Sequence, residues 1–370
     1  MPAPLAGVRV LDLGHDWACP HAARLLADFG ADVIKVEYLR RLDGMRGGVR
    51  RDGAYNRHPR FFQLNRNKRS VTLDLRDSAE RAAFLDLVRL SDLVMENARV
   101  GVLDGLGLGY ETLRTVKPDI ILLSMTAFGR TGPEAAYSGY GGTIEALSGI
   151  QALTAYARDE APRRIREMDV TNGILGACAA LTALVARQRT GQGQWIDLSE
   201  LEAATSGLIG EHLLEHARNG TQRLPVGNRD PRHAPQGCYP CSGEDRWVTL
   251  AVRSENEWGG LCEAMGHPEW RTDPRFTSTT QRHRHHDELD GLIELWTRAR
   301  THHEAMQRLQ AAGVPAGAVL DAADLASDPH LQARAFFLSA ADGSGRFPGL
   351  PFRLSGGGGE LVGDAPRKAG

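Results

Sequence analysis

One aspartate stands where the most regular helical pattern of this 370-residue chain begins. Asp169 follows Arg163, Arg164 and Arg166, and small residues recur at helical spacing over the stretch 169–189. Two interpretations fit these residue types. Aspartate is a favoured N-cap residue, and its charge complements the helix dipole. Alternatively, the carboxylate serves a function, with arginines close by and small residues leaving space for a ligand beside it.

A pair of cysteines has the spacing of a redox motif or of half a zinc site. Cys238-Tyr-Pro-Cys241 precedes an expected strand, whereas a redox pair belongs after a strand, at a helix N-terminus. A zinc site needs two more ligands, and only Cys262 and His233 lie near in the sequence. We therefore predict that these cysteines are structural.

Two histidine clusters resemble sets of metal ligands. His283-Arg-His-His286 and His302-His303 lie on polar helical segments, and no inward-facing carboxylate pattern accompanies them. We interpret both clusters as solvated helix faces and predict no metal site. The glycines of Gly105-Leu-Gly-Leu-Gly109 do not follow a strand and open a helix, so a nicotinamide or flavin cofactor is not expected.

Strand and helix patterns alternate through the first third of the chain. Residues 8–36 have the apolar spacing of a βαβ unit, and the alternation then repeats. This pattern predicts an α/β fold with a doubly wound sheet. The basic loop between Tyr38 and Pro59 is too long to be a simple connector. The expected elements are strands at 8–13, 33–36, 70–75, 92–96 and 120–124 and helices at 21–29 and 78–90.

The rest of the chain indicates a second domain. Residues 220–240 are rich in Pro, Gly, Asn and Arg, which is typical of a linker into a smaller domain. The tail, 347–370, is rich in glycine and proline and is expected to lie over the surface of the body. The expected elements are helices at 169–189, 199–219, 255–265, 283–298 and 302–312 and strands at 195–198, 247–252 and 318–320.

The overall composition is that of a globular protein with two domains. Hydrophobic residues make up 42% and charged residues 24%, and the length exceeds what one core usually fills. A formal charge of −2 argues against a nucleic-acid partner and against a polybasic membrane surface. Lysine occurs at only four positions, so nearly all cations are arginine. This skew reflects either codon composition or guanidinium groups gathered around phosphates or carboxylates.

The sequence also bears on the compartment. No charged and apolar leader precedes the strand at 8–13, and no stretch approaches the ~18 consecutive apolar residues of a membrane span. The five cysteines are odd in number and sparse, as reduced thiols are. We therefore expect a cytoplasmic protein without a membrane segment.

Short motifs along nearly the whole chain occur in a known order and spacing. They are Pro4–Leu13, Leu25–Glu37, Asn65–Leu75, Glu96-Asn97, Gly107–Tyr110, Gly129–Pro133, Arg189–Trp195, Gly227–Arg229 and Gly313–Gly317. Together they resemble the class III coenzyme A transferases, the CaiB/BaiF family. This family includes formyl-CoA transferase, the carnitine CoA-transferases and α-methylacyl-CoA racemase.

The resemblance implies a domain arrangement and an assembly. A large Rossmann-like domain would comprise residues 1–205 and be completed by 330–370. A small α+β domain would comprise 229–320, with linkers at 206–228 and 321–329. Two such subunits would be threaded through one another as interlocked rings, which makes the homodimer obligate.

The resemblance also implies a reaction. The family's nucleophilic aspartate falls on Asp169, although this residue can still cap its helix. Attack on an acyl-CoA thioester gives an enzyme-bound anhydride, and the returning CoA thiolate converts it to an aspartyl-CoA thioester. A carboxylic acid acceptor then takes up CoA through the reverse sequence. CoA is thus expected as part of the substrate, with no permanently bound cofactor.

The CoA-binding positions of the family carry over to several segments of this chain. Tyr38 occupies a position that is arginine in formyl-CoA transferase, and Arg40, Arg41 or Arg46 could supply the missing phosphate contact. The other positions are Trp17, Ala18, Leu73, Asp74, Leu75, Arg76, Asn97, Ala98 and Arg99.

Departures from the family pattern leave alternatives open. Trp17 replaces a glutamine that lies near the reacting carboxylate in formyl-CoA transferase, and Gly141 stands where members commonly have an acidic residue. One alternative is α-methylacyl-CoA racemisation, but Tyr140-Gly141 stands where its His-Asp pair would be. Another is an acyl-CoA-binding homologue that no longer catalyses transfer, which Gly141 favours and the retained Asp169 opposes.

Overall fold

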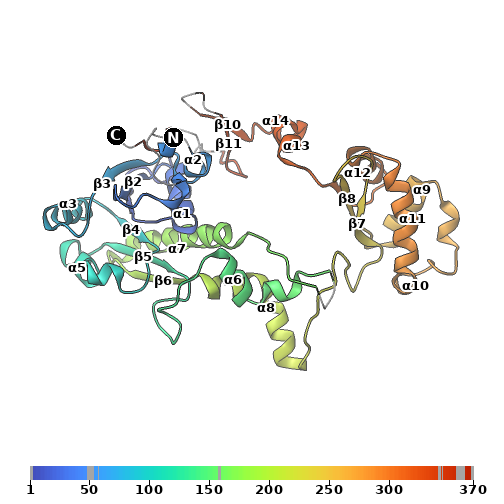
Figure 1. Cartoon of the computed structure of the whole chain (residues 1–370), viewed down its shortest axis with the longest axis horizontal. Coiled ribbons are helices and arrows are strands. Elements are labelled where there is room, and N and C mark those ends of the chain that lie inside the picture. Colours follow the sequence, from blue (N-terminus) through green and yellow to red (C-terminus); the bar gives the residue numbers. More distant parts are fainter. Residues whose placement is uncertain are drawn as a thin grey trace. The chain divides into compact units, whose positions relative to one another are not determined.

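The structure, a computed structural model, describes residues 3–47, 54–56, 58–156, 160–340, 343, 345–355 and 363–367 (Figure 1). The chain divides into two compact units. Unit 1 comprises Met1–Ala152, Arg163–Arg223 and His330–Gly370, and unit 2 comprises Leu153–Pro162 and Leu224–Pro329. Residues 153–162, expected in the large domain, thus cluster with unit 2. Much of the expected linker at 206–228 is helical, because α8 runs over Glu200–Asn219.

Unit 1 is built on a six-stranded sheet in which all neighbours are parallel. The strand order is β3-β2-β1-β4-β5-β6, so the chain reverses its direction of winding between β1 and β4. This is the order of doubly wound Rossmann folds. The predicted α/β class with a parallel sheet is confirmed. The strands are β1 (Arg9–Asp12), β2 (Asp32–Glu37), β3 (Arg69–Thr72), β4 (Leu93–Glu96), β5 (Ile121–Thr126) and β6 (Trp195–Ser199).

Helices cover both faces of this sheet because successive strand residues point to opposite faces. Val10 of β1 belongs to the apolar cluster under α1 (Ala18–Asp28) and α7 (Met168–Thr190). The next residue, Leu11, belongs to the cluster under α3 (Ser78–Arg89) and α5 (Tyr110–Val116). Each buried strand is therefore apolar on both sides, which explains the nearly continuous apolar runs in its sequence.

Small residues let α1 and α7 pack closely side by side (Figure 1). A Cβ added to Gly173 would lie 2.5 Å from His21 Cδ2 and 2.9 Å from the Ala18 carbonyl oxygen. One at Gly176 would lie 2.7 Å from Met125 Sδ. Among the described residues, α7 is the one helix long and apolar enough to cross a membrane by length and composition. One face of it is buried in unit 1, through residues that include Gly173, Ala177 and Ala180.

Substituting Gly173 tests this close packing. Gly173→Ala should destabilise the protein by about 1–3 kcal/mol, because the new methyl group meets backbone that cannot move aside. Gly207 lies in α8 with nothing within 4 Å of an added Cβ, so Gly207→Ala is the matched control. It should be neutral or stabilising, because alanine has the better helix propensity. Thermal melting of the two variants makes the comparison, and equal melting temperatures would contradict the packing argument.

The C-terminal segment completes unit 1. Phe347 of β11 and Ala365 share an apolar cluster with Phe61 and Phe62 of α2, and the rings of Phe62 and Phe347 are stacked. The Pro366 carbonyl oxygen accepts a hydrogen bond from Arg46, which ties the tail to the loop after β2. The remaining elements of this unit are η1 (Gly44–Arg46), η2 (Ala54–Asn56), α2 (Pro59–Asn65), α4 (Val102–Gly105), α6 (Gly141–Leu147), η3 (Ile150–Leu153), β10 (Phe337–Ser339) and β11 (Arg346–Pro348).

Unit 2 is an α+β unit around a three-stranded antiparallel sheet of order β7-β8-β9. The helix expected at 283–298 is interrupted: α10 ends at Arg284, His285 leaves the helical backbone, and α11 begins at His286. Ser278 caps α10 by accepting from the Gln281 amide. The elements are β7 (Gln236–Pro240), β8 (Trp247–Ala251), α9 (Glu255–Met265), η4 (Pro268–Arg271), α10 (Thr279–Arg284), α11 (His286–Arg298), α12 (His302–Ala311), β9 (Ala316–Ala318) and α13 (Ala322–Ser327), with α14 (Pro329–Ala333) following.

Candidate functional site

A cavity of about 810 Å³ opens at the carboxyl edge of the unit 1 sheet. Its walls are the segments that follow β1, β2, β3, β4 and β5, together with the first turns of α7 and α8. The loops after β1 and β4 form its centre, and these strands flank the point where the strand order reverses. Doubly wound sheets bind ligands at this place, because the loops diverge there and leave a crevice.

The structure brings together all the predicted site residues except one. Arg40 is exposed and does not line the cavity, whereas its neighbour Arg41 does. Arg46 is fully buried and bonds to both Glu37 carboxylate oxygens, so its guanidinium is unavailable to a ligand. A role for Arg40 in CoA binding therefore stays a prediction that the cavity does not support, and Arg41 is the better placed of the two arginines. The predicted residues on the wall are Trp17, Ala18, Tyr38, Leu73, Asp74, Leu75, Arg76, Asn97, Ala98, Arg99 and Asp169.

Three arginines, Arg41, Arg76 and Arg99, line this cavity. Arg76 donates to Asp74 and to the Tyr38 hydroxyl, and its guanidinium lies over the Tyr38 ring, 4.6 Å from the centroid. The Arg76 hydrogen bond lowers the pKa of Asp74 to about 2. The guanidinium groups of Arg41 and Arg99, by contrast, have no hydrogen bond or ion pair with any residue that the structure describes. Two cations are thus available to an anionic ligand.

Asp169 lies in the first turn of α7 but does not cap it. The N-cap position is held by Glu167, and no side chain accepts from the first amides of the helix. The capping interpretation is therefore wrong, and the half-buried carboxylate faces the cavity instead. Burial raises the pKa of Asp169, Arg164 opposes this rise, and Asp16 and Glu145 add to it.

The glycine at position 141 lies directly against this carboxylate. A Cβ at Gly141 would be 2.6 Å from Asp169 Oδ2 and 3.1 Å from its Cγ. Gly141, which stands where family members commonly have an acidic residue, therefore lies against the Asp169 carboxylate. Any side chain at this position would displace the carboxylate from where it now lies.

A second buried carboxyl on the cavity wall was not among the predicted residues. Glu200 begins α8 directly after its cap, Ser199, and is only 7% exposed. Burial and the neighbouring Asp169 raise the pKa of Glu200 to about 8. An acidic residue in the first turn of a helix is common on protein surfaces, because the helix dipole favours it there. Sequence alone therefore offered no signal that this one is buried.

Buried ions hold the loop between β1 and α1 at the base of the cavity. Lys68 Nζ lies 2.8 Å from Asp12 Oδ2, and Lys35 Nζ lies 2.9 Å from Asp43 Oδ2, all with fully buried side chains. Lys35 also donates to the Gly14 carbonyl oxygen at 2.7 Å. Burial opposes the charge of Asp12, but Lys68 and Lys35 outweigh it and lower the pKa of this carboxyl. The ion pairs thus fix the backbone that carries Trp17.

That loop presents unusual groups to the cavity. Asp16 has φ of 61°, a left-handed conformation that non-glycine residues rarely adopt. The Trp17 indole N–H and the Thr126 hydroxyl are buried and have no hydrogen-bond partner in the described part of the chain. Both residues line the cavity, and leaving such buried groups unpaired is costly.

Removing one partner of the buried ions should be costly. Lys68→Met should destabilise unit 1 by about 3–5 kcal/mol, because Asp12 would keep a buried charge without its nearest cation. Lys117 forms an ion pair with Asp119 at the surface, and Lys117→Met should cost less than about 1 kcal/mol. Urea unfolding followed by circular dichroism compares the variants. A Lys68→Met protein as stable as the Lys117→Met protein would show that these ions do not hold the fold.

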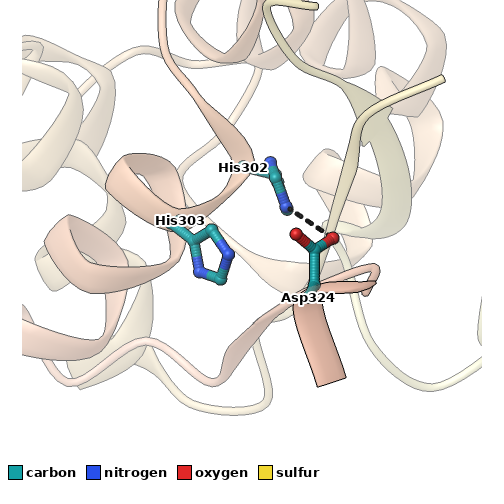
Figure 2. A group of neighbouring side chains, drawn as sticks. All are labelled: His302, His303 and Asp324. Atoms are coloured by element: carbon teal, nitrogen blue, oxygen red, sulfur yellow. Dashed lines mark ion pairs between the residues drawn. The ribbon is translucent and has the colours of Figure 1, made fainter. Parts of the chain in front are cut away.

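The histidine clusters of unit 2 are less solvated than expected. His286 and His302 are buried, so the interpretation of both clusters as solvated faces was wrong for these two residues. Figure 2 shows His302 facing Asp324, with Nε2 3.6 Å from Oδ2, and His303 beside them. Possible ligand atoms of the three residues lie within 4.8 Å of one another. Arg246 already contacts Asp324 Oδ2 at 2.7 Å, which neutralises the carboxylate that a cation would need.

The cysteines form no disulfide: all five are free thiols. Cys238 lies on β7 and Cys241 directly follows that strand, so the pair does not stand at a helix N-terminus. Burial raises the pKa of both thiols, and Cys238 adds to the effect on Cys241. Raised pKa values disfavour the thiolate that redox exchange and zinc binding require.

The sheet, the cavity at its switch point, and the carboxylate and unpaired guanidinium groups that line this cavity are the features of an enzyme with an anionic ligand. The chain belongs to the family described as CoA-transferase family III, whose model matches residues 5–369. It is therefore an enzyme of the CoA-transferase class, which uses acyl-CoA as a substrate, and the resemblance found in its sequence is confirmed.

Characterised and structural relatives agree with this assignment. Succinyl-CoA–D-citramalate CoA-transferase of Chloroflexus aurantiacus is 39% identical over 345 residues, 92% of this chain and 84% of that protein. Acetyl-CoA:oxalate CoA-transferase of Acetobacter aceti is 33% identical over 358 residues, 95% of this chain and 90% of that protein. The crystal structure of a CAIB/BAIF family protein from Brucella suis has a TM-score of 0.89 at 31% identity and covers 99% of this chain and 96% of that one.

Proposed function

We propose that this enzyme moves coenzyme A from an acyl-CoA donor to a carboxylic acid acceptor, with Asp169 as its nucleophile. The observation that carries the proposal is the position of Asp169: a half-buried carboxylate that caps nothing and lines the same cavity as Arg41 and Arg99. A carboxylate in such a place can attack an acyl carbon, and water that is kept from the cavity cannot hydrolyse the products.

The proposed reaction conserves the energy of the thioester. An Asp169 oxygen forms a bond to the acyl carbon, the carbon–sulfur bond breaks, and CoA leaves as a thiolate. The thiolate then attacks the Asp169 carbonyl of the mixed anhydride and releases the original acid as its carboxylate. The acceptor carboxylate reverses both steps: it attacks the aspartyl-CoA thioester, and the returning thiolate takes its acyl group. No proton needs to be transferred in this sequence.

The arginines on the cavity wall are suited to the CoA phosphates. Arg41 and Arg99 have unpaired guanidinium groups, and Arg76 is held in place by Asp74 and Tyr38. Apolar wall residues such as Leu73 and Leu106 provide surface for the uncharged parts of the molecule. Binding energy from this long substrate can be used to position the thioester against Asp169.

Asp169 should carry the covalent intermediate. Wild-type protein incubated with acyl-CoA and then hydroxylamine or borohydride should show a mass change on the peptide that contains Asp169. Asp169→Ala should lose this label and transfer activity, whereas Glu167→Gln, an exposed acid two residues away, should keep both. No label with any donor would overturn the proposal. Deuterium exchange at the α-carbon without CoA exchange would indicate racemisation instead.

A second test concerns the assignment of Arg41 and Arg99, and not Arg40, to the CoA phosphates. Arg41→Ala and Arg99→Ala should each weaken CoA binding by about 10- to 100-fold, because each removes a charged hydrogen-bond donor from a phosphate. The adjacent Arg40→Ala is the control and should bind as wild type does, since Arg40 lies away from the cavity. Calorimetry with CoA measures the dissociation constants. If only Arg40→Ala weakened CoA binding, the assignment of Arg41 and Arg99 to the CoA phosphates would be wrong.

Names of the relatives guide the choice of substrates to test. The Chloroflexus relative is named for succinyl-CoA and D-citramalate, and the Acetobacter relative for acetyl-CoA and oxalate. We therefore propose small organic acids as the substrate class of this chain. Trp17 and the described part of the loop after β2 line or border the cavity and are the residues expected to discriminate among them.

We further propose that the enzyme is an interlocked homodimer. The support within this chain is a set of large apolar side chains left exposed on two long helices, because exposed apolar surface often marks an interface. On α7 they are Ile174, Leu175 and Val185, and on α8 they are Leu213 and Leu214. A second copy of the chain would cover them.

A further inference from the structure

Glu200 is a buried carboxyl that the reaction proposed above does not use. Its side chain is 7% exposed and lines the same cavity as Asp169. It comes from the first turn of α8, whereas Asp169 comes from the first turn of α7, and the two helices pack together. Within the described chain, the Glu200 carboxyl makes no hydrogen bond and no ion pair, so its polar atoms remain free for a ligand.

The charges around Glu200 favour its neutral form. From α7 it faces Asp169, another acid. The acid of α6, Glu145, accepts from the Arg166 amide and from Arg164, and the acid of β6, Asp197, accepts from the Arg130 amide. No cation of the described residues forms an ion pair with Glu200. A buried carboxyl without a cation, next to another acid, retains its proton.

We propose that Glu200 is a catalytic residue that, as a neutral acid, donates a hydrogen bond to the oxyanion formed when Asp169 attacks the acyl carbon. This inference rests on the proposed function. As the bond from Asp169 forms, the acyl carbonyl oxygen gains the negative charge, and the bond to sulfur then breaks as the charge returns. Glu200 keeps its proton throughout, so the step balances without an acid or base.

A neutral Glu200 also avoids electrostatic repulsion of the Asp169 carboxylate. A negative charge at Glu200 would repel the Asp169 carboxylate and the developing oxyanion alike, and it would remove the donor. Burial and Asp169 raise the pKa of Glu200 to about 8, so the donor is present at neutral pH and is lost as the pH rises through this value. A buried carboxylic acid kept neutral can act as such a donor in an enzyme.

Substitutions at Glu200 separate this role from a structural one. Glu200→Leu should lower kcat by about 100- to 1000-fold with little change in KM, as loss of an oxyanion donor does. Glu200→Gln keeps a neutral N–H donor and should retain most of the activity. The wild-type rate should fall above a pH of about 8, and Glu200→Gln should lack this fall. Glu202 in the same turn is exposed, so Glu202→Leu and Glu202→Gln are the matched controls.

The outcomes distinguish the two proposals. CoA binding by each variant shows whether its cavity is intact. If wild type forms the Asp169 adduct but Glu200→Leu acylates as fast as Glu202→Leu, the Glu200 proposal fails alone. The Glu200 proposal also fails if Glu200→Gln binds CoA normally but is as slow as Glu200→Leu. It fails as well if the rate of Glu200→Gln falls above pH 8 as the wild-type rate does. If wild type forms no adduct with any donor, the proposed function fails and this inference with it.

Discussion

Asp12, at the end of the central strand β1, is paired in the interior with Lys68, and Lys35 Nζ lies 3.9 Å from the same carboxylate oxygen. The three side chains are fully buried, so their mutual attraction is what makes the burial of these charges tolerable. Through Gly14 and Asp43 the same group fixes the loop that bears Asp16 and Trp17. The loop leads into α1, and His15, Asp16 and Trp17 line the cavity, so the shape of the cavity depends on where this loop lies.

The cavity is lined by both cations and acids. Arg41 and Arg99 have no side-chain partner among the described residues, and we propose that they bind the phosphates of the substrate. Acids, Asp16, Asp169 and Glu200, line the same cavity, and burial makes ionisation of the last two less favourable. The near-neutral net charge of the whole chain does not reveal these groups, because a net charge does not report where the charged residues lie.

Sequence periodicity predicted the sheet well because its inner strands β1, β4 and β5, together with β2, are buried on both faces. The structure has strands and helices near all the positions expected in the N-terminal half, and the predicted helix 255–265 coincides with α9. Errors occurred where packing overrides local pattern. His286 and His302 lie on segments that look polar, yet they are buried, and the helix expected at 283–298 breaks at His285. Segments at 48–53, 157–159 and 356–362 lie outside the described residues.

The sequence by itself determined the family and the parallel α/β fold and proposed Asp169 as the reacting group, because family motifs and apolar periodicity are local properties of the chain. Only the tertiary structure decided that Arg41 and not Arg40 faces the cavity, since adjacent side chains in a turn point in different directions. Only the fold showed that Asp169 does not cap its helix and that Glu200 is buried beside it. The burial of a charged group depends on which distant segments cover it, and no local pattern records that.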